Sequence, residues 1–158
     1  MTRPTLAAAA CTLMLAACTL MLAACTAGQP APQSESAPTT QLGLKRQWML
    51  EQWPGFGREE LQRLQAGINL TSLPQASGSM GCNRLMFSVE TAAPQQREGR
   101  IRFGSVAATR MYCDGRMKLE ADFSSRIGSF TRYRLDGHYL ILQNNQGQSA
   151  RFVAQDWD

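Results

Sequence analysis

Large apolar residues recur at every second position from Arg84 to Glu90, where the sequence reads Arg-Leu-Met-Phe-Ser-Val-Glu. In an extended strand successive side chains point to opposite faces, so Leu85, Phe87 and Val89 would share one face. The pattern predicts a half-buried antiparallel strand whose other face meets solvent.

Further strands are expected on both sides of short turn sequences. Pro94 and Gly99 lie between the first strand and a second alternating segment, so a hairpin should pair the two. Asp136-Gly137 predicts a tight hairpin because this dipeptide readily adopts positive φ values. The expected strands are residues 100–103, 133–135 and 139–142, and a last one after Gly147 that carries Phe152 and Val153.

Two helices fit between the strands. Leu119, Phe123 and Ile127 recur every four residues, with Asp114 as a candidate cap at the start and Gly128 as a candidate terminator. A second, short helix is expected at residues 58–66, where Leu61 and Leu64 share a face and Gly67 follows; Trp48 and Trp53 are expected in or near the core beside it.

The N-terminal segment has the features of an export signal. Residues from Pro4 to Ser34 carry no charge, and Leu22-Ala23-Ala24-Cys25 reads as a bacterial lipobox. We therefore expect residues 1–24 to be a signal peptide and Cys25 to be lipidated. Cys18 also follows Leu-Ala-Ala and is the alternative cleavage site. A retained transmembrane anchor is a further alternative, although no basic cluster follows the apolar stretch.

Residues 25–41 are expected to form the lipidated cysteine and a flexible tether, because they are rich in Pro, Ser, Thr and Gln and contain no aromatic residue. Residues 42–158 have the length of one domain. The formal net charge is +4, and removal of Arg3 with the signal peptide lowers this excess by one. We expect a monomer attached by its lipid to the bacterial cell envelope, on the periplasmic or surface face of the outer membrane.

Cys82 and Cys113 are the remaining cysteines of the expected domain. An exported compartment permits oxidation, so a disulfide is the leading interpretation, and two buried thiols that pack as small hydrophobic groups are the alternative. We expect no metal and no other cofactor, because no Cys-x-x-Cys or histidine pair accompanies these cysteines and His138 is the single histidine.

Catalysis is not expected. The chain lacks Gly-x-Ser-x-Gly and Ser-x-x-Lys, and Glu59-Glu60 are adjacent on a helix and diverge.

Arginines recur on the predicted solvent sides of two strands, where they could form a stripe that binds phosphate or carboxylate groups or could simply be solvated. These residues are Arg100, Arg102, Arg132 and Arg134. The small net charge and the compartment argue against nucleic acid, and an anionic envelope glycolipid is the better candidate.

Two cysteine-bearing motifs resemble the META domain family of HslJ-like bacterial lipoproteins. They are Gly81-Cys82-Asn83-Arg84 and Ala108-Thr109-Arg110-Met111-Tyr112-Cys113, followed by the helix near residue 119 and the strand near residue 139. The resemblance covers most of residues 44–156. It implies an α+β fold in which a small, curved, barrel-like antiparallel sheet packs with one main helix. It also implies links to heat-shock or envelope stress and to antibiotic tolerance, without a settled molecular activity.

The motif residues favour structural tasks. Gly81 and Asn83 suit a bend with unusual φ, and the Asn83 amide can bind local backbone. Thr109, Arg110 and Met111 are expected to stabilise the entry to the helix, with Arg110 paired to a carboxylate; its guanidinium is alternatively a recognition group for a ligand.

The leading hypothesis is a lipid-anchored, non-catalytic protein that binds or shields another envelope component, a protein or an anionic glycolipid, during stress. One alternative is an inhibitor of a secreted protease or lysozyme that inserts a rigid loop such as residues 75–80 into the active site. Another is an assembly partner of outer-membrane machinery.

Overall fold

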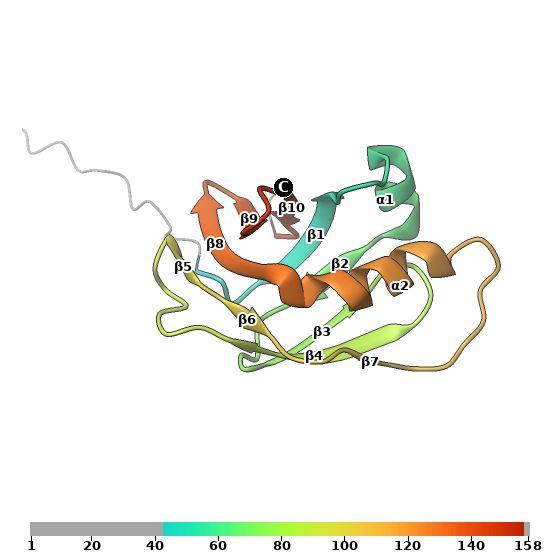
Figure 1. Ribbon diagram of the computed structural model, residues 1–158, viewed down its shortest axis with the longest axis horizontal. Coiled ribbons are helices and arrows are strands. Elements are labelled where there is room, and N and C mark those ends of the chain that lie inside the picture. The colour runs from blue at the N-terminus through green and yellow to red at the C-terminus, as the bar shows by residue number, and fades with distance from the viewer. Residues whose placement is uncertain (1–42, 157–158) are drawn as a thin grey trace, which may run out of the picture. The chain divides into compact units, whose positions relative to one another are not determined.

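The computed structural model describes residues 43–156, whose strands and helices are drawn in Figure 1. The signal peptide, the lipidation sites Cys25 and Cys18, and the tether lie outside the described residues. Within residues 43–156, no helix combines the length and the apolar character needed to cross a membrane.

The elements follow one another in the order β1 (Gln47–Gln52), α1 (Arg58–Leu64), β2 (Gly67–Asn69), β3 (Gln75–Ser79), β4 (Arg84–Glu90), β5 (Glu98–Arg100), β6 (Arg102–Phe103), β7 (Ala107–Ala108), α2 (Met117–Arg126), a short 3-10 turn η1 (Ile127–Ser129), β8 (Phe130–Asp136), β9 (Tyr139–Asn144) and β10 (Ser149–Ala154).

The strands form one antiparallel, nearly closed sheet. Its order is β5-β8-β9-β10-β1-β2-β3-β4-β6, and β7 also pairs with β4. Because β5 and β6 are consecutive in the chain, residues 98–103 pair with β8 at one end and with β4 at the other. This segment brings the two edges of the sheet together. The α+β fold with a barrel-like sheet and one main helix is confirmed (Figure 1).

Several strand predictions are confirmed. Along β4, Leu85, Phe87 and Val89 are buried and the residues between them are exposed. The Asp136-Gly137 turn joins β8 to β9, and Gly137 has a φ of +57°. The strand predicted after Gly147 is β10.

The prediction that residues 100–103 form one strand paired with β4 is wrong in part. Only β6 pairs with β4, with Val89 opposite Phe103, whereas β5 pairs with β8. The segment changes partner at Ile101, whose buried side chain and whose N–H bond to the Thr131 carbonyl fix the crossing point.

The helices differ from the prediction at their ends. Arg116, rather than Asp114, precedes the first turn of α2, and no side chain caps it. Gly128 does not stop the helix, since the chain continues as η1 to Ser129. The helix α1 ends at Leu64 instead of the predicted residue 66, because the next residue, Gln65, has a φ of +48°.

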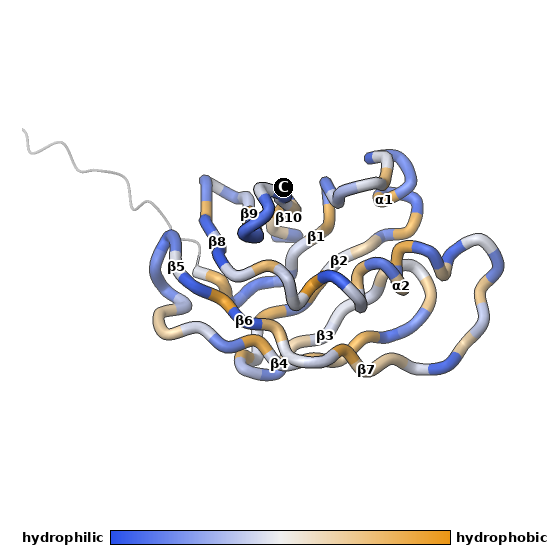
Figure 2. Tube along the Cα trace, viewed as in Figure 1, coloured by the Kyte–Doolittle hydropathy of each residue, from blue (hydrophilic) through white to orange (hydrophobic). Residues whose placement is uncertain are grey.

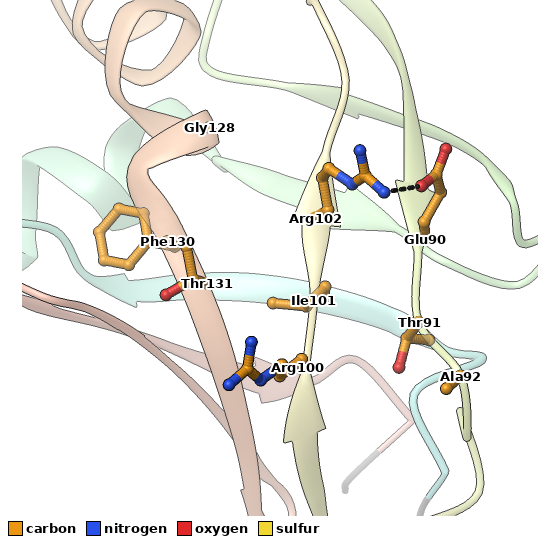
Figure 3. Close-up of a pocket in the computed structure, with 9 residues that line it drawn as sticks. All are labelled: Glu90, Thr91, Ala92, Arg100, Ile101, Arg102, Gly128, Phe130 and Thr131. Atoms are coloured by element: carbon orange, nitrogen blue, oxygen red, sulfur yellow. Dashed lines mark ion pairs between the residues drawn. The ribbon is translucent and has the colours of Figure 1, made fainter.

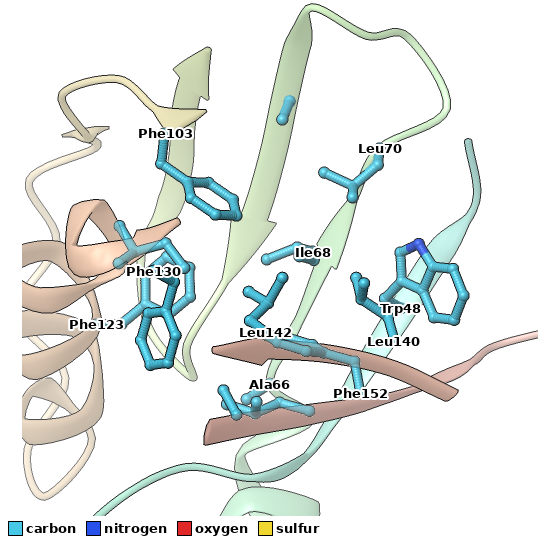
Figure 4. Packing of buried hydrophobic residues seen from close by; sticks show 14 of the residues in the cluster. Trp48, Ala66, Ile68, Leu70, Phe103, Phe123, Phe130, Leu140, Leu142 and Phe152 are labelled. Carbon is cyan, nitrogen blue, oxygen red and sulfur yellow. The ribbon is translucent and has the colours of Figure 1, made fainter. Parts of the chain in front are cut away.

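Apolar side chains from the sheet and from α2 fill the interior. The hydropathy tube shows apolar segments along the strands and on α2 (Figure 2). Trp48 and Trp53 are buried, as predicted. The Trp53 ring centroid lies 5.2 Å from that of Phe123 on α2 and 5.4 Å from that of Phe130 on β8. Figure 4 shows Phe123 and Phe130 packed beside Phe103, which links the helix to the sheet.

The loop suggested for an inhibitor is not a loop. Residues Gln75–Ser79 form β3, which lies inside the sheet with β2 on one side and β4 on the other. Their backbone groups are occupied by these neighbours, so this segment is not free to insert into an enzyme.

Candidate functional site

The two motif cysteines form a disulfide. The Cys82 and Cys113 sulfurs are 2.04 Å apart, and the two Cα atoms are 5.8 Å apart. This confirms the leading interpretation of the sequence. The bond ties the turn before β4 to the segment that leads into α2.

Asn83 is the centre of a buried hydrogen-bond cluster. Its side-chain oxygen accepts bonds from the Thr109 hydroxyl at 2.8 Å and the Met111 N–H at 2.7 Å. Its amide nitrogen donates to the Met111 carbonyl at 3.1 Å and to the Glu120 carboxylate at 2.8 Å. The residue is 2% exposed. The amide therefore binds backbone far along the chain, not the local backbone that the sequence suggested.

Glu120 is the member of this cluster that the sequence did not reveal. It is 6% exposed and accepts bonds from both the backbone N–H and the side chain of Asn83, each at 2.8 Å. A signal was present: residue 120 lies on the same face of the helix as Phe123 and Ile127, at spacings of three and seven. A carboxylate on an apolar helix face needs buried donors.

The other motif residues stabilise the fold, with the exception of Arg110. Gly81 has a φ of +112°, as the predicted bend requires, and a Cβ there would lie 2.6 Å from the Leu64 side chain. Thr109 and Met111 bind Asn83. Arg110 is exposed and forms no ion pair among the described residues, so its expected pairing with a carboxylate is wrong.

The four predicted arginines differ in their partners across the strands and in whether a carboxylate neutralises them. Arg100 on β5 lies directly opposite Arg132 on β8, whereas Arg134 lies opposite Glu98. Arg102 pairs with Glu90 at 3.1 Å, and Arg134 pairs with Asp136 at 2.9 Å. Among residues 43–156, no ion pair neutralises Arg100 or Arg132. The expected stripe of four cations is therefore reduced to one unneutralised pair.

Arg100, but not Arg132, lines a cleft at the place where the segment 98–103 changes partner. The cleft has a volume of about 570 Å³ and is lined by Glu90, Thr91, Ala92, Arg100, Ile101, Arg102, Gly128, Phe130 and Thr131. Figure 3 shows Arg100 and Arg102 on the same segment, with the dashed ion pair to Glu90 on one side and Thr131 of β8 on the other. The lining combines guanidinium and hydroxyl donors with apolar side chains.

The cleft suits recognition of an anion better than catalysis. A guanidinium offers paired donors that match phosphate and carboxylate oxygens. The lining holds one carboxylate, that of Glu90, which is already paired, and it contains neither histidine nor cysteine. Among the described residues, no group of three or more histidine, cysteine or acidic side chains is placed to hold a metal ion.

Comparison with known proteins identifies a family. The model of the META domain matches residues 40–157. No curated protein matches the chain. One similar solved structure is the NMR structure of a protein from Burkholderia xenovorans, with 25% identity and a TM-score of 0.57, which covers 81% of this chain and 99% of that one. A second NMR structure has 21% identity and a TM-score of 0.54, and covers 76% of this chain and 97% of the other. The second likeness bears on the fold alone.

Proposed function

Because this chain belongs to the META domain family, we propose that it is a non-catalytic, lipid-anchored protein of the bacterial cell envelope that binds an anionic envelope component through the cleft beside Arg100. The component we propose is a glycolipid or a protein that bears phosphate or carboxylate groups. The protein works as a monomer at the outer membrane and protects the envelope during heat or antibiotic stress.

The juxtaposition of Arg100 and Arg132 carries the proposal. Like charges placed directly opposite on neighbouring strands destabilise a sheet. An anion bound in the cleft at Arg100 would weaken that repulsion and accept hydrogen bonds from the Arg100 guanidinium. Ion pairs already engage Arg102 and Arg134, so these two residues add less to binding.

Anion binding is tested on the intact chain held in phosphatidylcholine nanodiscs. The probe is a phosphorylated glucosamine disaccharide, and acetate tests whether a carboxylate suffices. We expect Arg100→Glu to weaken phosphate binding about tenfold or more, equivalent to about 1.4 kcal/mol, because the new carboxylate would pair with Arg132 and leave no free cation. Binding of the original protein should also weaken as salt is added.

The matched control is Arg63→Glu on α1, which makes the same charge change at an exposed arginine outside the cleft. Binding by this variant should stay within about twofold of the original. Equal loss in both variants would mean that the probe responds to net charge, and undiminished binding by Arg100→Glu would remove the cleft from consideration.

The anchor is supported by the lipobox Leu22-Ala23-Ala24-Cys25 and by the polar segment that follows it. Mass spectrometry of the protein from its native membrane should show a chain that starts at Cys25 and carries acyl groups. A chain that starts at Cys18 would support the alternative site. An intact N-terminus or a mature chain without acyl groups would overturn lipid anchoring.

A further inference from the structure

A second surface of the domain exposes large apolar side chains. Among the described residues, the large hydrophobic side chains that stand out from the surface are Tyr112 at 82% exposure, Met111 at 61% and Met86 at 50%. Tyr112 and Met111 are neighbours in the segment between β7 and α2, which we call the Tyr112 loop (residues 109–116). Adjacent exposed apolar residues of this size are unusual on a surface that binds nothing.

The loop is held in place at three positions. The Thr109 hydroxyl donates to the Asn83 side chain, the Met111 backbone binds the same side chain through both its N–H and its carbonyl, and Cys113 is in the disulfide. These contacts lie on both sides of Tyr112. The backbone that carries the exposed tyrosine is therefore ordered before any partner arrives.

The charge around the loop is mainly positive. Arg110 and Arg116 lie within it and are exposed, and Arg84 adjoins it through a backbone bond from its N–H to the Thr109 hydroxyl. None of these arginines forms an ion pair within residues 43–156. Asp114 is the one acidic residue of the loop, and it accepts a bond of 3.4 Å from the Tyr112 hydroxyl.

We propose that the Tyr112 loop is a protein-docking site that inserts Tyr112 and Met111 into an apolar pocket bordered by carboxylates. Arginine, methionine and tyrosine are enriched at protein interfaces, and the sequence Arg110-Met111-Tyr112 presents all three in succession. A loop fixed by a disulfide loses little conformational entropy on docking. That benefit requires a partner with a defined shape, which favours a folded protein over a fluid membrane. The site is separate from the cleft beside Arg100 and does not depend on its function.

The test selects binders from a phage-displayed library of small folded domains with randomised surface residues, with the intact chain as the immobilised target. We expect one class of selected domains to combine acidic with large apolar residues on its randomised surface. Tyr112→Ser should weaken binding of that class about tenfold or more, the effect of losing a principal interface residue. Arg110→Glu should also weaken it, and should do so more at low salt than at high salt.

The matched control is Met86→Ser, which removes an exposed apolar side chain from β4 outside the loop, and its binding should stay within about twofold of the original. A Cys82→Ser/Cys113→Ser variant that remains folded should bind more weakly, because its loop is free to move. The proposal is overturned if no acidic and apolar class is selected, if Tyr112→Ser binds as well as the original, or if Tyr112 instead proves to be needed for sedimentation with phosphatidylglycerol vesicles.

Discussion

Substitution of Asn83 by alanine tests whether the buried amide cluster holds the domain together. The change removes four side-chain hydrogen bonds. The Asn83 side-chain oxygen accepts two of them, from the Thr109 hydroxyl and the Met111 N–H, and its amide nitrogen donates the other two, to the Met111 carbonyl and the Glu120 carboxylate. A neutral bond contributes about 1 kcal/mol net, and a bond to a charged group about 1.5–3 kcal/mol. Full loss would cost about 5 kcal/mol. Water can replace part of the bonding at Met111, which is exposed, so we expect about 3–4 kcal/mol.

Asn83→Asp separates the effect of the donor from that of the acceptor. The aspartate keeps the oxygen that faces Thr109 and Met111 but replaces the N–H that faces Glu120 with a second oxygen. Two carboxylates would then meet in a buried site, where like charges repel strongly. We expect this variant to lose at least as much stability as Asn83→Ala, although it preserves the shape of the side chain.

Urea unfolding followed by tryptophan fluorescence measures these changes, with the disulfide intact and the denaturant slope unchanged. Asn145→Ala is the control, because Asn145 is exposed and its effect should stay within about 0.5 kcal/mol. A loss below about 1 kcal/mol for Asn83→Ala would refute the reasoning, since it would mean that the four bonds contribute no more than contacts with water.

The neighbouring constraints give two more predictions. Cys82→Ser/Cys113→Ser should lower the free energy of unfolding by roughly 3 to 4 kcal/mol, the chain-entropy value for cysteines 31 residues apart; an unchanged urea midpoint would contradict it. Gly81→Ala should cost about 1–3 kcal/mol, because an L residue is strained at its φ and the methyl group would overlap Leu64. Gly115→Ala, where a φ of +68° leaves open space, should cost about 1 kcal/mol, and an equal loss in both variants would discount the overlap with Leu64.

Local features of the sequence predicted much of the fold. The two-residue alternation of β4 and the Asp136-Gly137 turn each depend on conformations that a few adjacent residues determine. The disulfide was also predictable, because Cys82 and Cys113 are the cysteines left once the N-terminal segment is set aside. The family motif also included Asn83 and its hydrogen-bond partners Thr109 and Met111 in the buried cluster.

Features that depend on distant partners were not predictable in the same way. Residues 100–103 alternate like one strand, and only the tertiary arrangement determines that β5 pairs with β8 while β6 pairs with β4. Glu120 resembles a solvent-facing helix residue unless its donor, Asn83, is known. Likewise, spacing alone could not show that Glu90 neutralises Arg102 and leaves Arg100 unpaired.

The core explains why an unfavourable pair of cations persists at the cleft. Ile101 and Tyr133 are buried, and Tyr133 lies opposite Gly99. The tyrosine ring packs closely on this glycine, because a Cβ atom built on Gly99 would lie 3.0 Å from the ring. A shift of one residue would turn every side chain of the strand to the other face, so these buried residues fix the register. That register places Arg100 opposite Arg132, although the two positive charges repel each other. Arg100→Glu should therefore keep the fold and raise its stability by about 0.2–1 kcal/mol, the range for cross-strand pairs. A loss of anion binding in that variant would then report on the cleft and not on unfolding.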